Sequence, residues 1–165
     1  MNNRVSSVGM SETLLFPSQG TYNDSDELII AVVNDTLSWI DDNLDENTRV
    51  KIITSRSGYT HWYFQRKFKE VTGITIAEYL RACRIINCTV ELITTNKKIL
   101  QIAMDNGFSS QQAFTRVFSN YLNFSPGVVR VRFYGKPSFI EEVKSDIFRP
   151  YPFFVNGWRS KFHNN

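Results

Sequence analysis

The sequence predicts an all-α protein in which two helix-turn-helix subdomains are joined by a long linker helix. Three observations carry this prediction. Apolar residues recur at spacings of three and four, and no two-residue period competes with them. A stretch that leads into a glycine occurs twice with the same offsets. Positive charge is concentrated between residues 49 and 132.

The helices follow from the apolar period and from local stop and start signals. Residues 1–27 are polar and lack a sustained period, so we expect a flexible leader there. From Leu28 the spacing predicts an amphipathic helix that ends near Asn47. Thr75 and Glu78 form a capping box that opens the linker helix, which is roughly 28 Å long at 1.5 Å per residue. The helices expected after the first cover about 49–56, 60–71, 75–93, 99–104 and 110–121, with another after Pro126.

The internal repeat defines the two subdomains. Four residues match at identical offsets, namely Val50, Ile53, Thr54 and Gly58 with Ile99, Ile102, Ala103 and Gly107. Further on, and with one residue inserted in the second copy, Tyr59, Thr60, Phe64, Arg66 and Phe68 correspond to Phe108, Ser109, Phe114, Arg116 and Phe118. The small residue before each glycine allows two helices to approach closely, and the glycine permits the turn. This pattern is typical of a helix-turn-helix.

The second helix of each copy has one apolar and one polar face. We expect Phe64, Phe68, Phe114 and Phe118 in the core. Arg can contact the O6 and N7 of guanine through its forked donors, and Gln can contact the N6 and N7 of adenine. The polar faces therefore supply the candidate base-reading residues Trp62, Gln65, Arg66, Gln111, Gln112, Thr115 and Arg116. The alternatives are ordinary surface polarity for the glutamines and packing against a neighbouring helix for Trp62.

Charge is segregated along the chain. Residues 1–48 contain one Arg and nine acids, whereas residues 49–132 contain thirteen Lys or Arg and four acids, a net charge of +9. Such a segment suits a surface that binds phosphates and releases their counterions, although a solvated cationic face would look the same.

Other classes of function find little support. We expect Cys83 and Cys88 to be packing residues, with redox sensing as the alternative. The two histidines and two thiols have no spacing that suits a metal, and no catalytic or cofactor-binding motif is present, so we expect no enzyme, cofactor or metal site. No apolar run is long enough to span a bilayer, and no signal peptide precedes the first helix, which predicts a cytoplasmic protein.

These stretches resemble the DNA-binding domain of the AraC/XylS family of bacterial transcription regulators, within it the MarA, SoxS, Rob and TetD group. The resemblance covers about residues 28–132 and is carried by residues 57–66, residues 107–116, Phe118, Tyr121, Phe124 and Ser125-Pro126. It departs from the group at His61, Tyr63 and residues 127–129, and in a longer leader.

The resemblance implies two homeodomain-like three-helix units that bind double-stranded promoter DNA as a monomer and activate transcription with RNA polymerase. It implies a nucleoid-associated protein that controls efflux, antibiotic-tolerance or stress genes, and it assigns the base-reading role to the residues named above. Arg81 and Arg130 fall where the family places phosphate contacts. We expect Thr60, Lys69 and Ser110 to contact phosphates as well.

Residues 133–165 have no counterpart in this resemblance. They contain nine aromatic residues, namely Phe133, Tyr134, Phe139, Phe148, Tyr151, Phe153, Phe154, Trp158 and Phe162. We expect a tail that packs against the domain, with a regulatory or partner-binding segment as the alternative. Two other functions stay open from the sequence: a ligand sensor that uses this aromatic tail, and a non-specific architectural DNA-binding protein.

Overall fold

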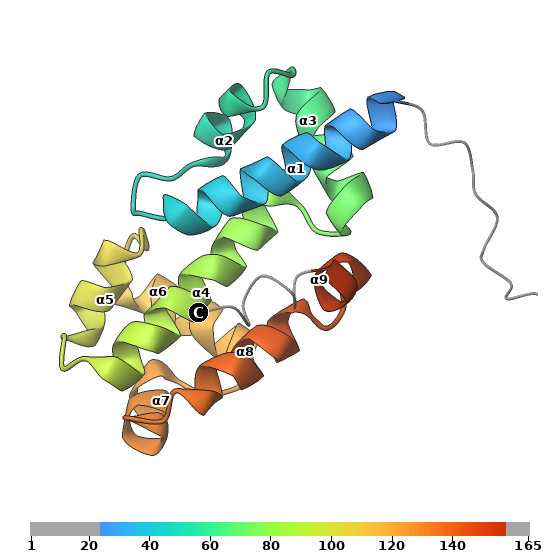
Figure 1. The fold of residues 1–165 in the computed structure, drawn as a ribbon. Helices are drawn as coiled ribbons and strands as arrows, with labels where there is room; N and C mark the ends of the chain where they lie inside the picture. The colour runs from blue at the N-terminus through green and yellow to red at the C-terminus, as the bar shows by residue number, and fades with distance from the viewer. Residues whose placement is uncertain (1–23, 158–165) are drawn as a thin grey trace, which may run out of the picture.

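A computed structural model describes residues 24–157, and every regular element in that range is a helix (Figure 1). The elements are α1 (Asp24–Asp42), α2 (Val50–Arg56), α3 (His61–Thr72), α4 (Ile76–Thr94), α5 (Ile99–Asp105), α6 (Gln111–Leu122), α7 (Pro126–Phe133), α8 (Ser138–Phe148) and α9 (Pro152–Gly157). The predicted all-α class with two helix-turn-helix units and a linker helix is confirmed. No helix in the described range is long and apolar enough to cross a membrane.

The linker helix α4 is the centre of the molecule. Figure 1 shows α1, α2 and α3 around its first half and α5, α6 and α7 around its second half. It has buried residues on several of its faces, including Ile76, Tyr79, Ile85 and Leu92. The capping box predicted at Thr75 and Glu78 opens it, with the Glu78 carboxylate accepting from the Thr75 backbone N–H at 3.0 Å. A helix buried on nearly all sides can serve as a rigid spacer between the two units.

The two turns share one backbone conformation. Gly58 and Gly107 both have φ of +76°, a left-handed value that side chains other than glycine rarely adopt. The recognition helices α3 and α6 then begin at hydroxyl N-caps, Thr60 and Ser110. The inserted residue in the second copy is therefore present, but the cap that matches Thr60 is Ser110, not Ser109 as the sequence alignment had placed it.

Arg84 joins the two units on one side of α4. Its guanidinium donates to the Thr48 carbonyl at 2.7 Å and to the Asp45 carbonyl at 3.4 Å, both in the loop between α1 and α2. A Cβ built on Gly107 would lie 3.3 Å from the same guanidinium and 3.1 Å from the Glu46 carbonyl oxygen. The absence of a side chain at Gly107 thus lets the second turn rest against the first unit.

The first helix differs from the prediction at both ends. It begins at Asp24 and not at Leu28, since acidic residues such as Asp26 and Glu27 are compatible with the first turn of a helix. It ends at Asp42, because the Asp45 carboxylate accepts from the backbone N–H of Asn47 and Thr48 and so holds a turn there. Residues 1–23 of the predicted leader lie outside the described residues.

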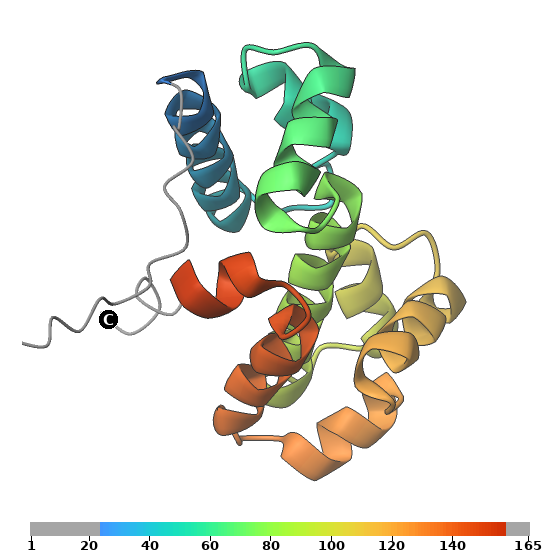
Figure 2. The ribbon, with the colours of Figure 1, turned by 90° about the vertical axis from the view of Figure 1, so that its right-hand side faces the viewer.

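The aromatic tail forms two further helices that complete the core. Phe133 stacks on Phe139 with ring centroids 3.7 Å apart, and α8 then runs along α4. Figure 2 shows α8 and α9 on one side of α4 and α6 on the other. At the far end Phe148 and Phe154 lie 5.7 and 5.5 Å from Tyr79, as ring centroids.

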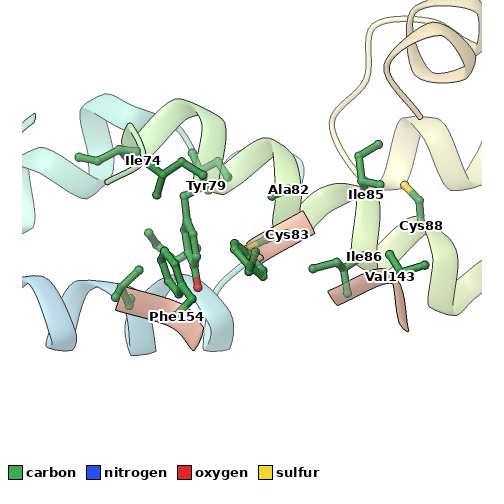
Figure 3. Close-up of a cluster of buried hydrophobic side chains, with 14 of the residues drawn as sticks. Ile74, Tyr79, Ala82, Cys83, Ile85, Ile86, Cys88, Val143 and Phe154 are labelled. Atoms are coloured by element: carbon green, nitrogen blue, oxygen red, sulfur yellow. The ribbon is translucent and has the colours of Figure 1, made fainter. Parts of the chain in front are cut away.

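These contacts link the second unit, α4 and α3 in one apolar cluster (Figure 3). Phe154 is 3% exposed and Phe148 is 4% exposed, so these aromatic side chains are part of the core. The structure therefore supports a tail packed against the domain. Trp158 and Phe162 lie outside the described residues.

Both thiols are also core residues. Cys83 faces the α8 side of α4 and Cys88 is fully buried (Figure 3). Burial raises the pKa of both thiols well above the usual range, which keeps them protonated. This environment supports the packing role and disfavours redox sensing.

The two turn glycines offer a matched test of how the units meet. Gly58→Ala should lower the free energy of unfolding by about 1 kcal/mol, because alanine is strained at this φ but meets no atom within 4 Å. Gly107→Ala carries the same strain and also a crowded Cβ, so we expect at least about 1 kcal/mol more. Urea unfolding of the two variants measures the difference. Equal losses would mean that the contact between the turn and the Arg84 guanidinium is not tight.

The structural role of the tail predicts a large effect at one buried ring. Phe148→Ala should destabilise the protein by about 3–5 kcal/mol, because it removes a side chain packed on Tyr79 and Phe154. Val155→Ala, at a 40% exposed position of the neighbouring helix, should change stability by no more than about 0.5 kcal/mol. If Phe148→Ala unfolded at the same denaturant concentration as the parent, the tail would not be part of the core.

Candidate nucleic-acid interface

The first recognition helix presents Trp62 and Arg66 outward. Trp62 is 70% exposed, which excludes the alternative that it packs against a neighbouring helix. The Arg66 guanidinium lies 5.0 Å from the centre of the Trp62 ring, and its Nε lies 3.7 Å from the Glu70 carboxylate. Phe64 and Phe68 are fully buried on the opposite face, as predicted. The helix therefore offers an aromatic ring and a guanidinium side by side on its exposed surface.

Gln65 is held in place by His61, a role that the sequence did not reveal. The Gln65 amide nitrogen lies 2.8 Å from Nε2 of His61, and Nδ1 of His61 lies 2.7 Å from the Thr54 hydroxyl. The Thr54 hydroxyl itself donates to the Lys51 carbonyl. A consistent assignment has Nδ1–H donating to Thr54 and Nε2 accepting from Gln65. This chain ties a recognition side chain to α2. The sequence signal for this link is His61 at the first position of α3, together with Thr54 four residues before Gly58.

The second recognition helix repeats the same distribution of exposure. Gln111, Gln112 and Arg116 are exposed, while Phe114 and Phe118 are fully buried. Thr115 is half-buried at the position that corresponds to Gln65 in α3. The four predicted base-reading residues of α6, together with Ser119, line one shallow hollow of about 390 Å³. The structure thus brings together all the residues predicted for this helix.

The predicted phosphate contacts are in different surroundings. Thr60 and Ser110 use a hydroxyl lone pair to accept from the backbone N–H of Tyr63 and Ala113, which leaves the O–H able to donate to a phosphate. Lys69 is exposed near the end of α3. These three side chains are accessible at the recognition helices.

Arg81 and Arg130 differ from each other. Arg81 is exposed on α4 and lines a cleft between the units. Arg130 is half-buried and donates to the Leu92 and Lys97 carbonyls at 3.4 and 2.7 Å, at the carboxyl end of α4. The Leu92 carbonyl is one that the end of α4 leaves unpaired, whereas the Lys97 carbonyl lies in the loop after α4. Arg130 thus has partners within the fold that a dedicated phosphate contact would not need.

The cleft beside Arg81 adds residues that the sequence did not single out. Arg49 and Arg84 line it together with Arg81 and Arg116, so it connects the first loop, α4 and α6. Burial and the neighbouring Arg49 both lower the pKa of Arg84. Within residues 24–157, no three His, Cys, Asp or Glu side chains come together as a metal site.

Comparison with known proteins identifies relatives of about 60% of the chain. The family model described as a helix-turn-helix domain matches residues 53–132. The chain is 44% identical over 107 residues to the TetD protein of transposon Tn10 from Escherichia coli, covering 65% of this chain and 78% of TetD. It is 40% identical over 101 residues to the regulatory protein SoxS of Escherichia coli K12, covering 61% and 94%. It is 36% identical to the multiple antibiotic resistance protein MarA of Salmonella typhimurium, covering 60% and 78%.

Solved structures support the fold. An AraC-type transcriptional regulator from Chromobacterium violaceum superposes with a TM-score of 0.60 at 24% identity, over 65% of this chain and 96% of that one. The DNA-binding domain of AdpA, solved with a target DNA, superposes with a TM-score of 0.56 at 24% identity, over 60% and 89%. Together with the sequence relatives, these matches establish that the chain belongs to the AraC-type family of helix-turn-helix DNA-binding transcription regulators.

Proposed function

We propose that this protein binds promoter DNA as a monomer and reads two adjacent major-groove segments, one with α3 and one with α6. The observation that carries the proposal is the matched exposure of the two helices, each with buried phenylalanines on one face and Arg with Gln on the other. Arg66 and Arg116 occupy equivalent positions two residues after Phe64 and Phe114. Forked donors at equivalent positions of two recognition helices suit guanine contacts in two places.

The linker helix sets the geometry of binding. At 1.5 Å per residue α4 is about 28 Å long, whereas successive major-groove segments on one face of B-DNA lie about 34 Å apart. Because α4 packs against both units, it cannot lengthen to make up the difference. We therefore expect the DNA to bend toward the protein.

We propose further that the bound protein activates transcription together with RNA polymerase in the bacterial cytoplasm. The relatives SoxS and AarP are named as a regulatory protein and a transcriptional activator, and MarA is named for multiple antibiotic resistance. The name of MarA supports genes of antibiotic tolerance as targets, and we propose stress and efflux genes together with them. The chain is proposed to act by binding, without catalysis and without a cofactor.

A non-specific architectural role is the competing function. It requires affinity from phosphates alone, which would weaken uniformly over all sequences when a cation is removed. The exposed Gln111, Gln112 and Trp62 favour base readout instead, because these side chains add little to phosphate affinity. The structure gives little support to a ligand sensor that uses the aromatic tail. Phe139, Phe148 and Phe154 are buried in the core and are therefore not available to a ligand.

Selection of bound sequences from a randomised DNA pool tests the proposal. The parent protein should enrich an asymmetric site with two short blocks about one helical turn apart. Arg66→Ala should blur one block and Arg116→Ala the other, each at a cost of about 1–3 kcal/mol at the selected site. The two variants serve as controls for each other. Enrichment of no site, or uniform weakening by both variants, would favour the architectural role.

The dependence of affinity on salt tests the phosphate contacts. Arg81→Gln should reduce the slope of log K against log[salt] by about one unit, because one phosphate contact is lost. Arg149→Gln is a charge-matched control, since Arg149 pairs with Asp146 on α8, the helix on the other side of α4. Arg130→Gln should mainly lower stability through its lost carbonyl contacts. An unchanged slope for Arg81→Gln would remove Arg81 from the interface.

A further inference from the structure

The cleft between the two units has an unusual charge. It has a volume of about 710 Å³, within the range of small-molecule sites, and four arginines line it: Arg49, Arg81, Arg84 and Arg116. No acidic residue lines it. In the part of the chain that the structure describes, none of these arginines forms an ion pair with a carboxylate. The cleft therefore concentrates positive charge that the fold itself does not neutralise.

Two acids close enough to interact with the cleft arginines are held by local hydrogen bonds. The Asp45 carboxylate accepts from the backbone and hydroxyl of Thr48, and the Glu78 carboxylate accepts from Thr75 in the capping box. Each interacts with a cleft arginine only at longer range. Neither can move into the cleft without giving up these local hydrogen bonds.

One buried donor in the cleft has no partner. Nε of Arg84 is buried and makes no hydrogen bond, although the terminal nitrogen of the same guanidinium reaches the Thr48 carbonyl. The fold thus leaves the Arg84 guanidinium without a full set of acceptors, although Nε itself is shielded from a ligand in the cleft. Arg84 also lies close to Arg49, which repels it. An anion in the cleft would relieve that repulsion.

Apart from the arginines, the lining combines apolar side chains with the polar residues Thr48, Ser109 and Asn120. Leu80, Phe108 and Val117 contribute side chains from α4, from the second turn and from α6. A bare phosphate gains nothing from such a wall, whereas a ring or alkyl chain that carries an acidic group can use both surfaces. The lining thus suits a ligand with an apolar body and one negative charge.

We propose that this cleft binds a small organic anion with an apolar body, and that the bound anion competes with DNA. The competition rests on the proposed function, because Arg116 both lines the cleft and is assigned to base reading. An anion that attracts the Arg116 guanidinium removes it from the groove. A DNA phosphate could meet the same arginines, so the test has to separate the two sources of negative charge.

Calorimetric titration of the free protein with 2-naphthoate, 2-naphthalenemethanol and inorganic phosphate makes that separation without DNA. We expect 2-naphthoate to bind about tenfold or more tightly than its neutral analogue and than phosphate. Arg49→Gln and Arg81→Gln should each weaken 2-naphthoate about tenfold. Lys51→Gln, an exposed cation outside the cleft, should leave its affinity unchanged. Equal binding of the alcohol, tighter binding of phosphate, or unchanged affinity in both cleft variants would overturn the proposal.

A second titration tests the competition with DNA. With the selected site, 2-naphthoate at ten times its own dissociation constant should raise the apparent dissociation constant for DNA about tenfold in the parent protein and less in Arg49→Gln. DNA binding that ignores 2-naphthoate would refute the regulatory half of the proposal. Failure to bind any DNA, with 2-naphthoate binding intact, would refute the proposed function and leave the anion site standing.

Discussion

The structure depends on the requirement that α4 be covered along its whole length. A unit of three helices is too small to enclose a stable core, so each unit packs against one half of α4. Ile76, Tyr79 and Leu80 are buried in the first half of α4, and Leu92 and Ile93 in the second half. The same residues that stabilise the fold therefore fix the separation of the recognition helices. A substitution that loosened α4 would disturb stability and DNA geometry together, even at a position far from DNA.

Two different sets of contacts connect the units, on opposite sides of α4. On one side Arg84 links the carbonyls of the first loop to the turn at Gly107. On the other side α8 and α9 connect Phe133 of the second unit to Tyr79 next to α3. The family match ends at residue 132, so the contacts of α8 and α9 lie beyond the matched domain. Both sets of contacts restrain the angle between the two units. The tail therefore makes the arrangement of α3 and α6 more rigid, and a preorganised pair of helices loses less entropy on binding.

Local signals were enough to predict the two turns, the capping box and the buried phenylalanines, because glycine conformation, hydroxyl caps and a 3.6-residue period depend on near neighbours in the sequence. What escaped prediction depends on distant neighbours. The contact of Phe148 with Tyr79 joins residues far apart in the chain, and no periodic feature of residues 133–165 specifies where α8 docks. The same holds for Arg84, whose carbonyl partners lie in another loop, and for Arg130, whose contacts with the Leu92 and Lys97 carbonyls the sequence did not indicate. His61 could be seen as an exposed side chain, but its link between Thr54 and Gln65 required the angle between α2 and α3.

The exposed faces of α3 and α6 carry similar side chains, but their arginines have different charged neighbours. Arg66 rests against Glu70 and over the Trp62 ring. The hydrogen bond from Lys67, together with the charges of Lys67 and Arg66, lowers the pKa of Glu70. To reach a base, Arg66 has to exchange an exposed ion pair that is worth little in water. Arg116 has no carboxylate partner in the described part of the chain, and α6 contains no acidic residue. When Arg66 contacts DNA it gives up its interaction with Glu70. Arg116 has no such interaction to give up, so it can bind either DNA or a small anion. This difference makes α6, next to the cleft, the half of the interface through which a small anion can control DNA binding.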